Sequence, residues 1–442
     1  MGTDRSQYGA PLVAWMEVAV PLLRSPGANK VYYQRRLLTA DFKSVVSPNE
    51  DTLYSDVLID LSTQDLIVTA PNVTDGRFWG YAFSDPCVSL SPVFYHCRKL
   101  TPSSYGNNFA NIGSVTSSPP GRYLIRRATE ALVEPEVTYC SNTSEFRGVI
   151  NAPTTYSLLD GRIYLRQNTT QDLDTVHRYQ DELTATLRNR SLAHSSTVSA
   201  PPVSIALLQT NGTFPSSRGD HLELLARLAP FNQPETYSDR WRVASLFGAA
   251  GIYNGHYHPQ PNVNLTQASL LANASILAAS TNPANILSLG NDWYTGALDL
   301  AGNFHDNYAY RAYIAETLYL QIVPSQAVYP RNRHYAAVAL PANQSLLFTF
   351  SDIPPVNADG FWSLTVYNED HALVSDPLNR YNIGTRDKLT FVDGTHAHPV
   401  SPNCHTTAKK PFQLLLQAAD EPPPANWSSK YVNPPFDSFK SK

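Results

Sequence analysis

The sequence predicts a mainly β protein with an α-helical middle section, built from two β-sandwich or jelly-roll-like domains. Three observations lead to this fold class. Thirty-four Pro and 21 Gly are spread over 442 residues, which suits many short strands joined by turns. Short strand-like runs fill one stretch near the start and another near the end of the chain. Between these stretches the apolar residues recur at helical spacing instead.

These patterns divide the chain into five consecutive segments. We expect an N-terminal helical and extended arm (1–44), a first β domain (45–169), a helix-rich middle section (170–325), a C-terminal β-sandwich domain (326–420) and a Pro-rich tail (421–442). The length fits two or three domains rather than one.

The arm begins with an apolar stretch at 10–23. Val13, Met16, Glu17, Val20 and Leu23 suggest an amphipathic helix. The stretch is too short and too polar to cross a bilayer, so no membrane span is expected.

The first β domain opens with "VVSPNEDTLYSDVLIDL". A turn at 47–50 precedes an alternating run in which Leu53, Val57 and Ile59 mark a half-buried strand. Several short strands separated by turn residues follow it.

Helical periodicity appears next. Leu173, Val176, Tyr179, Leu183 and Leu187 fall on one face of a predicted helix. The middle section ends in "NFHDNYAYRAYIAETLYLQIV", where we expect Asn303 to cap a further helix. Strand patterns return from residue 326.

Charge and motifs exclude several classes of protein. The net charge of −4 argues against nucleic-acid binding through a basic face. The chain has no Gly-x-Ser-x-Gly elbow, His-Glu-x-x-His, phosphate loop or dinucleotide fingerprint. We therefore expect no redox or nucleotide cofactor, although a catalytic triad assembled from distant residues stays open.

Sequons and cysteines favour a secreted protein. Nine Asn-x-Ser/Thr sequons predict glycosylation at Asn72, Asn142, Asn168, Asn189, Asn211, Asn264, Asn273, Asn343 and Asn426. Four cysteines, Cys87, Cys97, Cys140 and Cys404, suit two disulfides of unknown pairing. No signal peptide is visible, so we expect a processed form. The alternative is a cytosolic protein with buried thiols and accidental sequons.

Two His-x-His pairs are the candidates for a metal site. They are His256 with His258, and His396 with His398. On a strand each pair offers two imidazoles on one side. Both lie in Gly/Pro-rich loops without a nearby carboxylate, so surface or turn histidines are the alternative.

Polar residues are densest in "SPNEDTLYSD". Asp51 is a candidate general base or the partner of an Arg, with Asn49, Thr52 and Tyr54 beside it. The alternative is local turn chemistry, in which Asn and Asp side chains cap their own backbone.

Two further polar groups are candidates. On the helix near residue 310, His305, Tyr308 and Arg311 are spaced to form a polar wall for an anionic or carbonyl ligand, or to join the helix to the sheets. In "GFWSLTVYN", Tyr367 and Trp362 point to opposite faces of a strand. Arg380 is an obvious partner for a buried Asp51.

At these motifs the chain resembles a two-domain family that joins DUF1254 to DUF1214. The resemblance covers residues 40–385 and rests on "SPNEDTLYSDVLIDL", "APNVTDGRFWGYAFSD", "YRAYIAETLYLQIVPSQAVYP" and "GFWSLTVYNEDHALVSDPLNRYNIG". It implies two β-sandwich or jelly-roll-like domains with helices between them, and no agreed reaction. The polar positions it shares are Asn49, Asp51, Thr52, Tyr54, Asp60, Arg77, Arg162, Tyr308, Arg311, Trp362, Tyr367, Asn379, Arg380 and Tyr381.

We therefore expect an enzyme that acts on a hydrophobic small molecule by acid/base chemistry, through hydrolysis, isomerisation or cyclisation. Asp51 is the expected base, and Tyr308, Arg311 or Arg380 stabilise negative charge on oxygen. The expected substrate-binding residues are Asn49, Thr52, Tyr54, Trp79, His305, Trp362, Tyr367 and Tyr381. The alternatives are a secreted ligand- or glycan-binding protein and a structural cell-surface module.

Overall fold

The computed structural model describes most of the chain. The described residues are 10–85, 107–128, 136–141, 143–190, 199–233, 237–261, 263–334, 344–357, 359–375, 381–389, 391, 395, 410–417 and 432–433.

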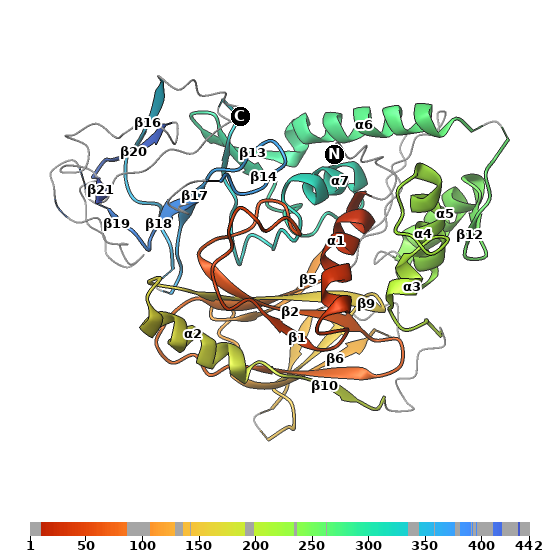
Figure 1. The fold of residues 1–442 in the computed structure, drawn as a ribbon, viewed down its shortest axis with the longest axis horizontal. Helices are drawn as coiled ribbons and strands as arrows, with labels where there is room; N and C mark the ends of the chain where they lie inside the picture. Colours follow the sequence, from red (N-terminus) through yellow and green to blue (C-terminus); the bar gives the residue numbers. More distant parts are fainter. Residues whose placement is uncertain are drawn as a thin grey trace.

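Two five-stranded sheets pack face to face in the N-terminal half (Figure 1). The first has the order β1 (Val31–Tyr33), β2 (Thr52–Asp60), β9 (Tyr156–Tyr164), β4 (Trp79–Ser84), β5 (Asn108–Gly113). The second has the order β10 (Ala185–Arg188), β3 (Asp65–Ala70), β6 (Gly121–Arg127), β8 (Gly148–Ala152), β7 (Val137–Tyr139). β6 and β8 run parallel, and the other described pairs are antiparallel.

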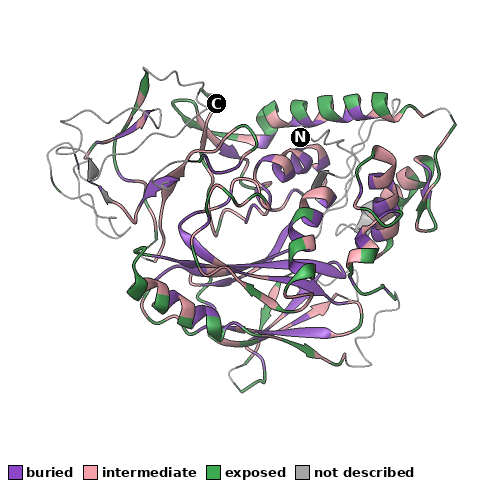
Figure 2. Cartoon of the chain, in the orientation of Figure 1, coloured by how far each residue is buried: buried purple, intermediate pink, exposed green. Residues whose placement is uncertain are grey.

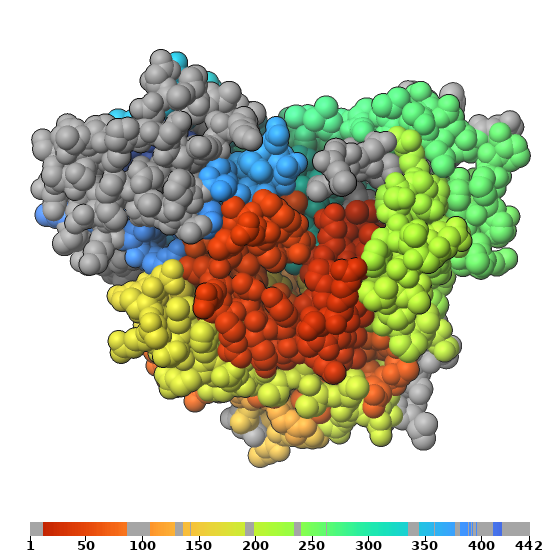
Figure 3. Space-filling model, in the orientation of Figure 1, coloured from red at the N-terminus to blue at the C-terminus, as the bar shows by residue number. Residues whose placement is uncertain are grey.

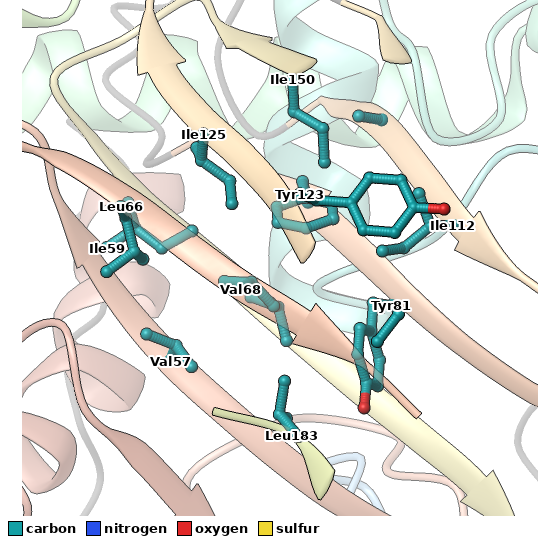
Figure 4. Close-up of a cluster of buried hydrophobic side chains, with 14 of the residues drawn as sticks. Val57, Ile59, Leu66, Val68, Tyr81, Ile112, Tyr123, Ile125, Ile150 and Leu183 are labelled. Atoms are coloured by element: carbon teal, nitrogen blue, oxygen red, sulfur yellow. The ribbon is translucent and has the colours of Figure 1, made fainter. Parts of the chain in front are cut away.

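The core between the sheets follows from strand alternation. Every second residue of β2 points inward, so Val57 and Ile59 meet Val68 and Ile125 of the second sheet (Figure 4). Leu183, at the end of α2 (Thr170–Glu182), closes this core at one edge. The same alternation points the intervening β2 residues to the other face of the first sheet.

Helices cover that other face. α1 (Ala10–Arg24) buries Trp15 against Tyr156 of β9, and α7 (Tyr308–Thr317) packs against α1. The helices between α2 and α7 are α3 (Ile205–Leu208), α4 (Arg218–Leu228), α5 (Tyr237–Ala249) and α6 (Leu265–Thr281). Short 3-10 helices occur at Ala229–Phe231 and Pro283–Asn285, and a hairpin at β11 (Ile252–Tyr253) and β12 (His256–Tyr257). Figure 2 shows that most of α1 is buried or half-buried, whereas much of α6 is exposed.

The C-terminal region has its own small core. Phe412 stacks on Phe350 and packs against Trp362. The chain after α6 also forms a three-stranded sheet of β13 (Ile286–Gly290), β14 (Trp293–Gly296) and β15 (Arg331–Asn332). The other described strands form two-stranded sheets: β16 (Ser345–Phe350) with β20 (Phe412–Gln417), β17 (Ser363–Thr365) with β18 (Asn382–Gly384), and β19 (Lys388–Leu389) with β21 (Val432–Asn433).

The prediction of a mainly β chain with helices is confirmed. The finer prediction of jelly rolls is not confirmed by these strand orders. α7 starts four residues later than expected, because the side chain of Asn307, rather than Asn303, accepts a hydrogen bond from the backbone N–H of Tyr310. Within the described part of the chain, no helix is both long and apolar enough to cross a membrane.

Candidate active site

A row of polar residues crosses the outer face of the first sheet. Strand register places Tyr32 opposite Asp56, Asp56 opposite Asp160, Asp160 opposite Ala82, and Ala82 opposite Asn111. Residues directly opposite each other in a sheet share a face, with Cβ atoms about 5 Å apart. The two carboxyl groups of Asp56 and Asp160 are therefore immediate neighbours.

The neighbouring row on the same sheet face contains a positively charged side chain, that of Arg162. Arg162 lies opposite Tyr54, and its guanidinium is 5.3 Å from the centre of the Tyr54 ring. Its Nε and Nη2 lie 2.8 and 2.6 Å from Oδ2 of Asp160. The hydroxyl of Tyr329 is hydrogen-bonded to the same guanidinium. Arg162 thus holds Asp160 as an ion pair next to Asp56.

Both ends of this face are covered, but by different parts of the chain. Toward one end, α1 packs on Leu58 and Leu158. Toward the other, Phe361 stacks on Tyr164 with ring centres 4.6 Å apart. The polar row lies between these two covers.

The row faces a hollow. Tyr54, Asp56, Tyr329 and Tyr367 lie deep in the protein, yet each keeps part of its surface accessible to solvent. Deep side chains retain accessible surface only where a cleft or cavity reaches them. Figure 3 shows this face hollowed between the red atoms of α1 and the orange-red atoms of the segment 28–50 that follows it.

Burial strongly perturbs Asp56. Desolvation, reinforced by the neighbouring charge of Asp160, raises the pKa of Asp56 well above its usual value, and Arg162 only partly opposes this. Oδ1 of Asp56 is buried and has no hydrogen-bond partner among the described residues. A carboxyl group in this state holds its proton to higher pH than an exposed aspartate, and so serves as an acid.

The surrounding tyrosines stay protonated, because burial raises the pKa of Tyr54, Tyr329 and Tyr367. Tyr367 donates its hydroxyl proton to the carbonyl of Pro48 at 2.9 Å. Tyr54 is hydrogen-bonded to the backbone of Asn49, and Tyr329 to the backbone of Ile322. These three tyrosines therefore lie near Arg162 with their hydroxyls already engaged.

A second charged cluster joins the first β region to the C-terminal region. Arg386 Nη2 lies 2.8 Å from Oε2 of Glu50 and 3.9 Å from Oδ1 of Asp51. Asp51 also accepts hydrogen bonds from Ser363 and Asn382. Burial raises the pKa of both acids, that of Glu50 to about 7.

This cluster changes the expected role of Asp51. Its ion-pair partner is Arg386, where the sequence suggested Arg380, which lies outside the described residues. The turn alternative also holds locally, since Oδ1 of Asn49 accepts from the N–H of Asp51 and the hydroxyl of Thr52. Asp51 is 1% exposed and fully engaged, which suits a structural contact.

The polar wall on α7 lies elsewhere. Arg311 is buried, with its guanidinium 4.9 Å from the Tyr308 ring and Nη2 donating to the carbonyl of His305. It lines a small pocket with Phe304, Ile314, Ala315, Tyr319, Leu320 and Gln321. None of the Asp51 contacts involves this wall, so the structure does not bring these predicted catalytic residues together.

Three predicted substrate-binding aromatics belong to cores. Trp79 packs inside the sandwich against Tyr81, and Trp362 inside the C-terminal core. Tyr381 is 2% exposed and packs with Leu38 and Leu373. His305 is exposed, and its Nε2 lies 3.1 Å from the carbonyl of Asp299. Of the predicted substrate-binding residues, Tyr54 and Tyr367 lie near Arg162 of the polar rows.

The described histidine pair forms no metal site. His256 Nδ1 lies 3.0 Å from Oε1 of Glu223, and the His258 ring stacks on Tyr253. Within the described ranges there is no group of three metal-ligating side chains. His396 and His398 lie outside them.

Of the four cysteines, Cys140 is described and is a free thiol, so its predicted disulfide is not confirmed. Cys87, Cys97 and Cys404 lie outside the described residues, as do the sequon residues Asn142, Asn343 and Asn426. The other six sequon asparagines are all exposed: Asn72, Asn168, Asn189, Asn211, Asn264 and Asn273.

Sequence reasoning missed Asp56, Asp160, Glu50 and Arg386. A signal was present, because Asp56 and Asp160 interrupt strands whose neighbouring residues are largely apolar, in "YSDVLID" and "SLLDGRIY". Arg162 follows Asp160 at the two-residue spacing that puts both side chains on one face.

Two family models match the chain. DUF1254, described as a protein of unknown function, matches residues 28–90 and 101–187, and DUF1214, described in the same words, matches 326–428. No curated protein matches. The VPA0106 protein from Vibrio parahaemolyticus has a similar fold, with TM-score 0.53 and 16% identity over 98% of this chain and 92% of that chain. An uncharacterised protein from Burkholderia cenocepacia aligns with TM-score 0.33 and 11% identity over 94% and 78%.

Proposed function

The chain belongs to the family that joins DUF1254 on its N-terminal side to DUF1214 on its C-terminal side, and we propose that it is an enzyme acting on a hydrophobic small molecule by acid/base chemistry in the hollow above β2 and β9. One observation carries the proposal. Asp56 and Asp160 lie opposite each other on the paired strands β2 and β9, with Asp160 held by Arg162, and no described residue is hydrogen-bonded to Oδ1 of Asp56.

The pair provides an acid and a base side by side. Two neighbouring carboxyl groups cannot easily both ionise, so they share one proton. Arg162 binds Oδ2 of Asp160, and burial raises the pKa of Asp56, so Asp56 is the member of the pair that carries the proton. General acid and general base groups each contribute about 10²–10⁴-fold to a rate. This assigns to Asp56 and Asp160 the chemistry that the sequence suggested for Asp51.

The walls favour an apolar substrate. Tyr54, Tyr329 and Tyr367 present ring surface, since their hydroxyls are bonded to the backbone or to Arg162. Sites for small molecules are commonly apolar hollows with a few convergent polar groups.

The test is a mass-spectrometric comparison of a metabolite extract of the source organism. The extract is incubated with native protein, heat-inactivated protein, Asp56→Asn and Asp181→Asn. Asp181 is the matched control, because its side chain is 62% exposed and pairs at the surface with Arg35. We expect a compound consumed by native protein and by Asp181→Asn only. Equal consumption by Asp56→Asn would refute the proposed site.

We also propose that the protein is secreted and glycosylated. The exposure of all six described sequon asparagines supports this, since oligosaccharides need surface positions.

A further inference from the structure

We propose that the substrate is an epoxide on an apolar carbon skeleton, which the Asp56–Asp160 pair opens with water to a vicinal diol. This inference rests on the proposed acid/base function and names its substrate class. Three features of the polar row support it within the described part of the chain: Oδ1 of Asp56 has no hydrogen-bond partner, Oδ1 of Asp160 accepts no hydrogen bond, and the strand segments that carry both residues are paired on each side.

The donor is Asp56. Its Oδ1 is buried, and no described residue offers it a hydrogen bond or accepts one from it. A buried carboxyl group in the acid form needs an acceptor for its proton. An ether-type oxygen suits this place, because it accepts a hydrogen bond and has no proton of its own to place.

The base is Asp160. Both Arg162 contacts go to Oδ2, so Oδ1 accepts no hydrogen bond from the described residues. A carboxylate oxygen that is held in position and free on one side can bind a water molecule and take its proton.

The reaction balances with water as the only co-reactant. A water lone pair forms the new C–O bond as Asp160 removes a water proton. The epoxide C–O bond breaks toward oxygen, and that oxygen receives the proton of Asp56. The proton on Asp160 then returns to the neighbouring Asp56, which restores the starting state.

The site disfavours ester and glycoside hydrolysis. An ester needs donors for the tetrahedral oxyanion, often backbone N–H groups. Around the pair, residues 55–57 of β2 lie between β1 and β9, and residues 158–163 of β9 lie between β2 and β4, so the backbone N–H groups there serve the sheet. A sugar ring needs partners for its hydroxyls, whereas the nearby tyrosine hydroxyls are already engaged. Ring strain lets an epoxide react with an acid and a base alone.

The test uses styrene oxide, cyclohexene oxide and limonene oxide in water enriched in ¹⁸O. We expect native protein to form diols carrying one ¹⁸O, and the trans diol from cyclohexene oxide. Asp56→Asn and Asp160→Asn should each lower the rate at least about 100-fold. Asp181→Asn should match native protein. The native rate should fall at both low and high pH, because the pair works with one shared proton.

Several results would overturn the inference. One is no diol from any of the three epoxides, and another is diol formation that Asp56→Asn leaves intact. Turnover of p-nitrophenyl butyrate in place of the epoxides, abolished by Asp56→Asn, would refute the substrate class while leaving the proposed function in place. If the extract comparison also showed nothing consumed, the proposed function itself would fall.

Discussion

Asp56 has two properties that a residue with a purely structural role seldom has together. Its carboxyl group is placed where its charge is unfavourable, and it has a buried oxygen that the described protein does not satisfy. Asp51 is more deeply buried but is satisfied by Arg386, Ser363 and Asn382. Asp56 is therefore the candidate catalytic group, whereas Asp51 joins the first β region to the C-terminal region.

The first prediction follows from the cost of burying Asp56. A carboxyl group whose pKa is raised in the folded state makes the protein less stable as pH rises above the unfolded pKa. Asp56→Asn should therefore raise the free energy of unfolding by about 1–2 kcal/mol near pH 7 while it abolishes activity. Thermal melts near pH 4 and pH 7 measure this, and the gain should shrink at the lower pH.

Asp181→Asn is again the control and should change stability by less than about 0.5 kcal/mol. Loss of stability in Asp56→Asn at neutral pH would mean that Asp56 has a structural role.

The second prediction concerns Glu50, whose pKa burial raises to about 7. Its folded pKa lies above the unfolded value of 4.5, so its ionisation destabilises the protein between about pH 4.5 and 7. The stability of native protein should fall across that range relative to Glu50→Gln, by up to about 3 kcal/mol. Parallel pH profiles of the two proteins in urea titrations would contradict this.

Sequence analysis identified residues of this neighbourhood unevenly. Tyr54 and Tyr367 stood out because polar aromatics lay in dense polar motifs. Asp56 and Asp160 did not, because alternation alone assigns them to the outer face of a strand, where charges are common. Only the covering of that face by α1 and the C-terminal region makes them unusual, and that contact joins segments far apart in the chain.

At the scale of elements, β9 sets the geometry of the site. Its central Gly161 separates Asp160 from Arg162 and points toward the sandwich core. A Cβ there would lie 2.6 Å from the carbonyl oxygen of Ser55 and 3.0 Å from the Tyr81 ring. The strand can pack this closely against β2 only because residue 161 has no side chain.

Gly161→Ala should therefore destabilise the protein by about 1–3 kcal/mol and lower activity, since β9 must shift and carry Asp160 with it. Gly248→Ala is the matched control: it lies in α5 with open space around its Cβ position, and should stabilise by about 0.5–1 kcal/mol. Urea titrations and rates of both variants test this. An unchanged rate in Gly161→Ala would show that the site does not depend on this strand position.

Element prediction succeeded where local pattern dominates. The helical spacing of Val176, Tyr179 and Leu183 predicts their burial, which the structure shows. The prediction that Leu187 belongs to the same helix face was wrong, because Leu187 lies in β10 and is exposed. Pairing of β10 with β3 overrides helical periodicity there, and such pairing depends on residues more than 100 positions away.

At the scale of the whole molecule, the surface bears on where the protein acts. Six exposed sequon asparagines predict that chains made in a eukaryotic secretory host carry several N-glycans. Endoglycosidase treatment should lower the mass in several steps, and Asn72→Gln and Asn273→Gln should each remove one step. A mass equal to that of the bare chain would refute glycosylation.

The arrangement that creates the hollow could not be predicted from the sequence. It depends on α1 covering part of a sheet face, and no local sequence pattern indicates that contact.

The central claim is that Asp56 holds a proton beside the Asp160–Arg162 ion pair, and infrared difference spectroscopy tests it without a substrate. Native protein is compared with Asp56→Asn at about pH 6, where an ordinary aspartate is ionised. Glu50, whose pKa is about 7, contributes a similar band to every variant, so the readout is the native-minus-variant difference. We predict that native minus Asp56→Asn contains the C=O stretch of a protonated carboxylic acid, and that native minus Asp181→Asn does not. If Asp56→Asn retained this band unchanged, Asp56 would be ionised, and the acid/base pair proposed for the hollow would be contradicted.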